Sequence, residues 1–213
     1  GQLRWVERDY PIPIRLRSQP NDPHYPQLWH LHATDTTPPG SHIHVEEVWS
    51  QTMGLKPNLE PIRIALVDDG FDLEHPDLMW GSGYDIADNA SLSTSDNNPS
   101  YHTGDWHGTQ TAGVIAARQN NDIGVTGVCP ECLLLPVRLT GQGGPTNLFT
   151  TGSAVAASIE WAADTGQADI INHSWGPPDR NPLMPTAPSK LWPEAAHADG
   201  ATGLPRVIEE AIE

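Results

Sequence analysis

The sequence predicts an α/β domain in which helices flank a parallel β-sheet, and two observations support this fold class. First, the chain contains three continuous apolar runs of strand length, over Ile62–Val67, Leu133–Leu139 and Ala168–Ile171. Runs without polar alternation are typical of strands that are buried on both faces, as in parallel sheets. Second, helical patterns lie between these runs, and the resulting strand–helix order favours right-handed crossovers.

Three helical patterns complete this order. The first covers His107–Ala116, and the second spans about Thr151–Thr165 with Gly166 as its stop signal. A third pattern starts near Pro205 and is still running at Glu213. Because this last pattern is unfinished, we expect the sheet to be incomplete in this chain, with the remainder of the fold cut away or carried on another chain.

The first 60 residues differ from the rest of the chain. They are rich in Pro, His and Trp and show little periodicity, apart from a short amphipathic stretch around Val45, Val48 and Trp49. We expect residues 1–60 to form an extended arm that packs on the α/β portion at 61–213. A chain of 213 residues with 37% apolar residues is long enough for one domain with a core, and its 21 prolines indicate rigid, ordered loops.

The chain is strongly acidic, with 27 acidic and 11 basic side chains and a net charge of −16. This charge argues against a nucleic-acid backbone or an anionic membrane as the partner, and it favours cations. Solubility alone explains the same composition equally well. No apolar run approaches the roughly 18 residues of a membrane span, and residues 1–10 lack the apolar core of a secretion signal. We therefore expect a mature or trimmed protein without a membrane span.

An acidic pair marks the end of the first predicted strand. Asp68 and Asp69 follow the apolar run, and Gly70 permits a sharp turn after them. Functional groups in parallel α/β sheets gather at the carboxyl ends of the strands, where this pair lies. An Asp-Asp-Gly turn after a strand is common, so the pair alone is a weak signal.

A histidine opens the first predicted helix, in the segment His-Gly-Thr-Gln-Thr-Ala-Gly-Val at 107–114. The positive end of a helix disfavours the imidazolium form, so a histidine there tends to stay neutral and able to accept a proton. A lone histidine at a helix start is more often a cap or a surface residue.

Taken together, these segments resemble the subtilisin family, whose catalytic residues follow the chain order Asp, His, Ser. Asp68 stands at a strand end, His107 opens a helix 39 positions later, and Ser-Trp-Gly at 174–176 follows the third strand. The chain is most similar to the kexin and proprotein-convertase branch, because of its Asp-Asp-Gly turn, its arm segment at 21–31 and Ser-Trp-Gly-Pro at 174–177. The resemblance covers nearly all of residues 20–213 and implies a subtilisin-like fold.

The resemblance implies a serine endopeptidase. Asp68 would orient and stabilise the imidazolium of His107, and His107 would act as general base and then as general acid in acyl transfer. The family's nucleophile lies in a Gly-Thr-Ser segment and its oxyanion Asn in an Ala-Gly-Asn-like segment, and neither pattern occurs here. Ser153 and Ser174 match a helix start and a substrate-binding strand, so neither is expected to be the nucleophile. We expect that residue on the C-terminal remainder of the same peptidase.

Substrate-binding positions follow from the same resemblance. The glycine-rich loop after the second strand and the segment after the third would hold a peptide backbone as an added strand, although the glycines also fit ordinary loop punctuation. Two acidic positions match the convertase pocket for a basic residue, so cleavage after a basic residue is expected. Gly-Gly-Pro-Thr-Asn at 143–147 and Arg180 depart from the convertase pattern, so strict dibasic specificity is not implied. The expected contacts are Asp69, Gly141, Gly143, Ser174, Trp175, Gly176 and Asp179.

Calcium is the expected cofactor, because it binds hard oxygen ligands and the chain offers many. One set resembles the strong calcium site of the family and would fasten the arm to the core: Asp22, Asp77 and Asn121 by side chain, and Arg118, Ile123 and Val125 by carbonyl. A second set, Asp85, Asp88, Asp96 and Asn98, resembles another calcium loop of the convertases. Asp and Asn also form turns through their own side chains, which explains the second set equally well.

Histidine and cysteine clusters have alternatives to metal binding. The four histidines at 30, 32, 42 and 44 suggest zinc, but apolar Ile43 and Val45 alternate with histidine as in a half-buried strand, which we favour. Cys129 and Cys132 form a Cys-Pro-Glu-Cys pair that fits a local disulfide, a thiol pair or half of a zinc site. No second pair exists in the sequence, and we favour small-residue replacement with a local disulfide over redox catalysis.

The leading hypothesis is a secreted or periplasmic, calcium-dependent serine endopeptidase that arises by zymogen processing. Its expected partners are the remainder that carries the Ser, a peptide or protein substrate, and a propeptide or chaperone-type inhibitor. The alternative is a non-catalytic calcium-binding fragment of the same family that acts in protein interaction, although the intact Asp68 and His107 weigh against it. A metallopeptidase is disfavoured because no His-Glu-x-x-His motif occurs.

Overall fold

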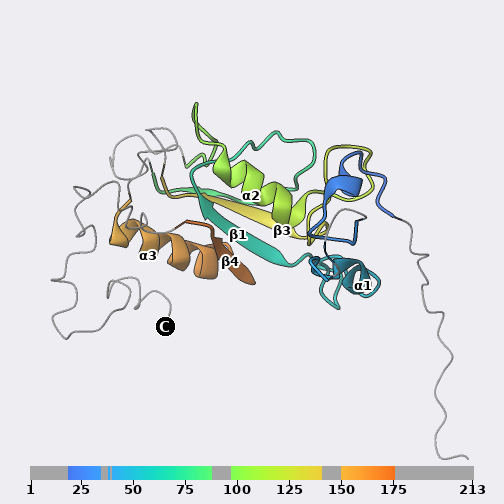
Figure 1. Cartoon of the computed structure of the whole chain (residues 1–213). Helices are drawn as coiled ribbons and strands as arrows, with labels where there is room; N and C mark the ends of the chain where they lie inside the picture. The colour runs from blue at the N-terminus through green and yellow to red at the C-terminus, as the bar shows by residue number, and fades with distance from the viewer. Residues whose placement is uncertain (1–18, 35–37, 39, 88–96, 141–149, 176–213) are drawn as a thin grey trace, which may run out of the picture.

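A computed structural model describes residues 19–34, 38, 40–87, 97–140 and 150–175, and all structural statements below concern these residues. Their centre is a parallel sheet of four strands (Figure 1). The strands are β1 (Arg63–Asp68), β2 (Tyr84–Asp85), β3 (Leu133–Arg138) and β4 (Ile170–His173). They lie in the order β2-β3-β1-β4, and all three pairings are parallel. The predicted fold class, an α/β domain with a parallel sheet, is confirmed.

Three of the four strands lie where the apolar runs predicted them, within about two residues at each end. β2 was not predicted, because two residues, Tyr84 and Asp85, form no apolar run. It joins the sheet through backbone pairing with Val137 and Arg138 of β3. This strand therefore forms because of its pairing with β3, and the local sequence pattern does not predict it.

The two faces of the sheet are covered by different helices (Figure 1), because successive strand residues point to opposite sides. Helix α2 (His107–Ala116) covers one face, with a core cluster that includes Ile64, Leu66, Leu134, Ala112 and Ala116. Helix α3 (Gly152–Glu160) covers the other face, with a cluster that includes Val67, Val137, Val155 and Ile159. The central strands are thus buried on both sides, as their uninterrupted apolar sequences predict.

The two helices that cover the sheet, α2 and α3, lie where the sequence pattern predicts them. α2 begins at His107 as expected. Thr151 caps α3, since its hydroxyl accepts a hydrogen bond from the Ala154 N–H at 3.1 Å. α3 continues into a π-helical turn, η3 (Trp161–Thr165), and Gly166 follows it as the predicted stop. The helix expected after residue 205 lies outside the described residues.

The described part of the arm contains a 3-10 turn, η1 (Tyr25–Gln27), and a short helix, α1 (Val45–Trp49), around a small core of Tyr25, Leu31 and Val45. The strand predicted from the alternation around Ile43 is wrong. His44 adopts a φ of 57°, which an extended strand does not allow, and it precedes α1 directly. The Trp49 indole N–H donates to the Val128 carbonyl at 2.9 Å, so α1 is fastened to the loop after α2.

Cys129 and Cys132 form a disulfide within this loop. Gly54 of the arm lies against it at a φ of +121°, and a Cβ there would stand 2.7 Å from the Cys129 sulfur. Only glycine suits this position, because both the backbone conformation and the close contact exclude a side chain. The disulfide therefore serves local packing between the arm and the start of β3.

Candidate active site

The end of β1 and the start of α2 bring a carboxylate and an imidazole together. Asp68 is the last residue of β1 and is only 4% exposed, while His107 is the first residue of α2. The Nδ1 atom of His107 lies 2.8 Å from Oδ1 and 3.0 Å from Oδ2 of Asp68. With Nδ1–H donating to the carboxylate, the Nε2 atom is left as the proton acceptor. This arrangement can hold a neutral imidazole in one orientation and stabilise it once it is protonated.

The electrostatics of the pair follow from its burial and its hydrogen bonds. The hydrogen bond to Asp68 raises the pKa of His107 above its ordinary value, although partial burial of the ring acts against this. Burial raises the pKa of the Asp68 carboxyl, while the hydrogen bonds from His107 and from the backbone N–H of Asp69 oppose that rise. The pair therefore suits a proton acceptor whose protonated form is stabilised by the neighbouring carboxylate.

Asp69 supports the helix that carries the imidazole. Its Oδ2 atom accepts from the His107 N–H at 3.2 Å, and its Oδ1 atom accepts from the Gly108 N–H at 2.8 Å. A buried carboxylate at this point satisfies N–H groups that the first helical turn leaves unpaired and complements the positive end of the helix. The carboxylate is 4% exposed and faces the helix start. The expected role of Asp69 in substrate binding stays a prediction.

Gly108 allows α2 to approach β1 closely. A Cβ at this residue would lie 2.5 Å from the Gly70 carbonyl oxygen, 2.9 Å from the Phe71 ring and 3.1 Å from the Asp68 Cβ. Backbone atoms cannot give way to such a contact as a flexible side chain can. The glycine therefore sets the distance between the carboxylate and the imidazole.

Gly108→Ala is expected to lower the free energy of unfolding by about 1–3 kcal/mol, because the added methyl group overpacks the contact between helix and strand. Denaturant unfolding of the intact protein measures this loss. Gly113→Ala in the same helix is the matched control, since a Cβ there meets nothing within 4 Å and alanine is the better helix former. Equal losses in both variants would contradict the packing explanation.

A buried arginine, which the sequence patterns did not predict, lies at the end of β3. Arg138 ends β3, is 0% exposed, and pairs in register with Asp68 of β1. Its Nη1 atom donates to Asp85 Oδ2 at 2.8 Å, and both side chains of this ion pair are fully buried. A signal for it was available in the sequence, because Arg138 is the one charged residue at the end of an otherwise apolar strand.

This ion pair bears on the second calcium site expected from sequence. The carboxylate of Asp85 binds Arg138 and accepts a backbone N–H from Ala87 at 2.9 Å, so in the structure a guanidinium neutralises it. The side chain of Asn98 accepts from both the N–H and the hydroxyl of Ser100, which is the local turn given as the alternative. Asp88 and Asp96 lie outside the described residues. In the structure the two described members are engaged by these other groups, and the second calcium site stays a prediction.

The residues of the first predicted calcium site lie close together in the structure. Asp22 of the arm accepts from the N–H groups of Asn120 and Asn121 at 3.0 and 3.3 Å, and from the Thr126 hydroxyl at 2.6 Å. Asp77, on the turn after β1, accepts from the Asn121 amide at 2.7 Å. The remaining predicted ligands lie in the same loop: Arg118 donates its N–H to the Asp77 carbonyl, Val125 donates to the Asp77 carboxylate, and Ile123 donates to the Asn121 side chain.

The chemistry of this cluster fits a hard cation. Asp22 and Asp77 are 2% and 1% exposed, and neither forms an ion pair within the described part of the chain. Buried carboxylates require a compensating charge, and carboxylate, amide and carbonyl oxygens are the ligands that calcium prefers. Among the described residues, no three His, Cys, Asp or Glu side chains come together in a way that could hold a metal. A cation at this cluster would therefore need amide and carbonyl oxygens in addition to the two carboxylates. Thr126 was missed, since a lone threonine in a loop carries no signal.

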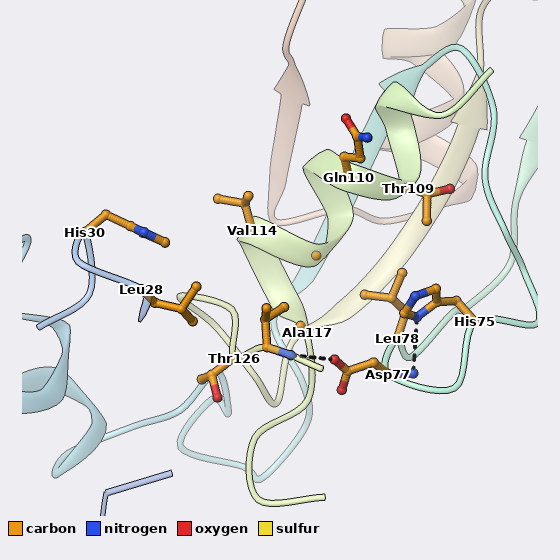
Figure 2. A pocket seen from close by; sticks show the side chains of 12 residues that line it. Leu28, His30, His75, Asp77, Leu78, Thr109, Gln110, Val114, Ala117 and Thr126 are labelled. Atoms are coloured by element: carbon orange, nitrogen blue, oxygen red, sulfur yellow. Dashed lines mark hydrogen bonds between the residues drawn. The ribbon is translucent and has the colours of Figure 1, made fainter. Parts of the chain in front are cut away.

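A pocket of about 310 Å³ adjoins this cluster, between the arm and the outer side of α2 (Figure 2). Leu28 and His30 of the arm form one wall, and Val114 of α2 lies opposite them. Asp77 lies at the floor beside His75, whose Nδ1 atom accepts the Asp77 N–H at 3.3 Å. Asp77 is thus shared between the pocket and the candidate cation site.

The predicted substrate-binding residues are placed only in part. Ser174 follows β4, and its hydroxyl accepts from the Asn172 amide at 2.9 Å. Trp175 packs on the α3 face of the sheet and donates its indole N–H to the Val67 carbonyl at 2.9 Å. The other predicted contacts, Gly141, Gly143, Gly176 and Asp179, lie outside the described residues.

None of the helices in the described part of the chain is both long and apolar enough to span a bilayer.

Comparison with known proteins adds to this geometry. Residues 60–208 match the family model described as the Subtilase family. The chain is 35% identical over 159 residues to a calcium-dependent protease of Trichormus variabilis, in an alignment that covers 73% of this chain and 21% of that protein. It is 37% identical over 129 residues to a subtilisin of Bacillus pumilus, which covers 61% of this chain and 42% of that protein.

Two further relatives agree. A halolysin-like extracellular serine protease of Natrialba magadii is 34% identical over 159 residues, covering 74% of this chain and 26% of that protein. A solved protease structure from Pseudoalteromonas arctica superimposes with a TM-score of 0.59 at 27% identity, covering 75% of this chain and 51% of that one. The matched region spans less than half the length of the three curated relatives.

Proposed function

Because this chain belongs to the subtilase family, we propose that it forms part of a calcium-dependent serine endopeptidase and supplies two members of the catalytic triad. The observation that carries the proposal is the 2.8 Å hydrogen bond between the His107 ring and the buried Asp68 carboxylate. The placement of both residues at the carboxyl edge of the sheet, where parallel α/β folds present their functional groups, supports it further.

In this mechanism His107 acts through its Nε2 atom. It takes the proton from a serine hydroxyl as that oxygen attacks the scissile carbonyl, and it returns the proton to the leaving amine. Asp68 fixes the tautomer and stabilises the imidazolium that forms in between. Asp69 contributes by holding the first N–H groups of α2, which keeps the imidazole aligned with Asp68.

The nucleophilic serine and the oxyanion donor come, in this proposal, from polypeptide outside the 213 residues printed here. No serine of the sequence lies in a Gly-Thr-Ser segment, and Ser174 is engaged with Asn172 beside β4. The proposed partner is therefore the C-terminal remainder of the same peptidase. Mass spectrometry of the intact sample should detect a peptide that contains a Gly-Thr-Ser segment, on the same or an associated chain.

The proposed substrate is a peptide in extended conformation. It would lie against the segments after β3 and β4, at Gly141, Gly143 and Ser174–Gly176, and pair with them by backbone hydrogen bonds. Asp179 would favour a basic residue before the cleaved bond, in line with the similarity to the kexin branch. Secretion is proposed from the likeness to a halolysin-like extracellular protease.

Calcium, in this proposal, binds between Asp22 and Asp77. When bound, it would neutralise the two buried carboxylates and join the arm to the loop after α2. Asn121 would contribute its side chain, and Arg118, Ile123 and Val125 their carbonyls. The names of two relatives, calcium-dependent proteases of Trichormus variabilis and a Nostoc species, support the same cofactor.

The acid limb of the activity profile should report on the imidazole. Only neutral His107 can accept the serine proton, and the hydrogen bond to Asp68 raises its pKa. We therefore expect kcat/KM to rise with pH through an apparent pKa above the ordinary histidine value of about 6.5. Stopped assays of a peptide substrate across pH 5 to 9 measure this limb, and an apparent pKa at or below about 6.5 would contradict the assignment.

Labelling with a fluorophosphonate probe tests the proposed function directly. The intact protein, with calcium present and inhibitors removed, is expected to label on a serine, and His107→Ala should abolish the label. His44→Ala is the matched control, because this exposed histidine of the arm precedes α1 and pairs with Glu47 of the same helix. Absence of any label on wild-type protein would favour the alternative, a non-catalytic calcium-binding fragment that acts in protein interaction.

A further inference from the structure

The end of β3 holds an arginine that the triad mechanism does not use. Arg138 is fully buried and stands between β1 and β2, in register with Asp68 on one side and Asp85 on the other. A buried guanidinium at the carboxyl edge of a sheet is costly to desolvate, so its position requires partners on every side. The structure supplies such partners on three different segments.

Each part of the guanidinium contacts a different segment. The Nε atom donates to the main-chain carbonyl of Asp69 at 3.2 Å, and the Nη1 atom donates to Asp85 Oδ2 at 2.8 Å. The Nη2 atom lies 3.0 Å from Nδ1 of His102. Since a guanidinium is only a donor, His102 accepts through Nδ1. One planar group thus joins the ends of β1 and β2 to the loop before α2.

The contacts of Arg138 lead to both members of the catalytic pair. Asp69, whose carbonyl the arginine binds, follows Asp68 and caps the first N–H groups of α2. His102 opens a closed turn that ends at Asp105, because the two residues exchange hydrogen bonds of 2.9 and 3.1 Å. This turn leads directly into His107. The carboxylate side and the imidazole side of the pair are therefore both fixed to one guanidinium.

We propose that Arg138 is a positioning residue for the peptidase reaction, which aligns Asp68 with His107 by cross-linking the segments that carry them. Asp85 neutralises the arginine in this arrangement. The inference rests on the proposed function, but it makes its own prediction about geometry. Loss of the three-way contact should weaken turnover and the hydrogen bond between the two catalytic side chains, even where the fold is kept.

The first test is Arg138→Lys in the intact protein. Lysine keeps a positive charge next to Asp85, but its single ammonium group lacks the planar fork that reaches three separate partners. We expect a folded variant whose kcat falls by up to about 100-fold while KM is unchanged, because misplaced catalytic groups affect turnover and not substrate binding. A wild-type kcat in this folded variant would overturn the proposal.

The second test removes the ion pair altogether, in the double variant Arg138→Met and Asp85→Leu. Apolar replacement of both partners avoids an unpaired buried charge and often preserves stability. If the arginine serves only the fold, this stable double variant recovers full activity. If it positions the catalytic pair, kcat remains low although the thermal unfolding transition is that of the wild type. Leu135→Ala, a core variant of the same strand, shows what a loss of stability alone does to kcat.

A readout without substrate separates this inference from the proposed function. The His107 Nδ1 proton, held against Asp68 at 2.8 Å, should give a strongly downfield proton resonance in the wild type. Both Arg138 variants are expected to broaden or lose this resonance, and Leu135→Ala to keep it. If wild-type protein shows the resonance but no peptidase activity, only the proposed function fails. An unchanged resonance in both variants, or failure of both to fold, would overturn the positioning role.

Discussion

Asp68→Asn is expected to reduce peptidase turnover by about 10⁴-fold while the fold is retained. The asparagine side chain has nearly the same shape, but it carries no charge to stabilise the protonated ring. Its amide group also allows the ring to settle in the other tautomer, with the proton on Nε2, so that His107 no longer accepts a proton there. Measurement of kcat with a peptide substrate, alongside a thermal unfolding curve, tests both parts of this expectation.

Asp72→Asn is the matched control for that variant, since it removes the same charge from the turn that follows β1. Among the described residues its side chain accepts the Glu74 N–H at 3.1 Å, which an amide oxygen can also accept. We expect near wild-type turnover from this control. Similar losses in the two variants would mean that general charge effects, and not the contact with His107, determine the rate.

Removal of calcium is expected to lower the melting temperature of the intact protein, because the buried carboxylates of Asp22 and Asp77 would lose the cation proposed between them. At a calcium concentration 100 times its Kd, binding contributes about 2.7 kcal/mol to stability. For a domain of this size that corresponds to roughly 5–10 °C in Tm. Differential scanning calorimetry with calcium and with a chelator measures the difference, and Asp77→Asn should remove it by making Tm equally low in both buffers.

Asp122→Asn is the control within the same loop. Its carboxylate is exposed, and its positive φ of 61° is one that asparagine readily adopts. This variant should keep the calcium-dependent rise in Tm. A wild-type Tm that does not respond to chelation would exclude a stabilising cation at the cluster of Asp22 and Asp77.

Much of the active site could be predicted from sequence because its residues sit at element boundaries that leave local signals. An apolar run that ends in Asp68 predicts a strand end, and the small residues after His107 predict a helix start that packs closely. The direct contact of the two side chains follows once both elements lie on one parallel sheet. Their catalytic roles remain predictions, as do the substrate contacts.

Other features depend on tertiary contacts that leave no local pattern. β2 exists only because Tyr84 and Asp85 pair with β3, and the ion pair with Arg138 joins residues 53 positions apart. The strand expected around Ile43 failed because alternation of apolar and polar residues was taken as a period of two. In the structure a left-handed His44 breaks the extension, and Val45 is buried through a helix.

Helix α2 carries the imidazole at its first residue, while the loop that follows its last residue wraps around Asp22 and Asp77. Ten helical residues make a stiff rod of roughly 15 Å, too short and too well packed to bend between its two ends. The cation proposed between Asp22 and Asp77 would therefore hold one end of the rod whose other end carries the imidazole.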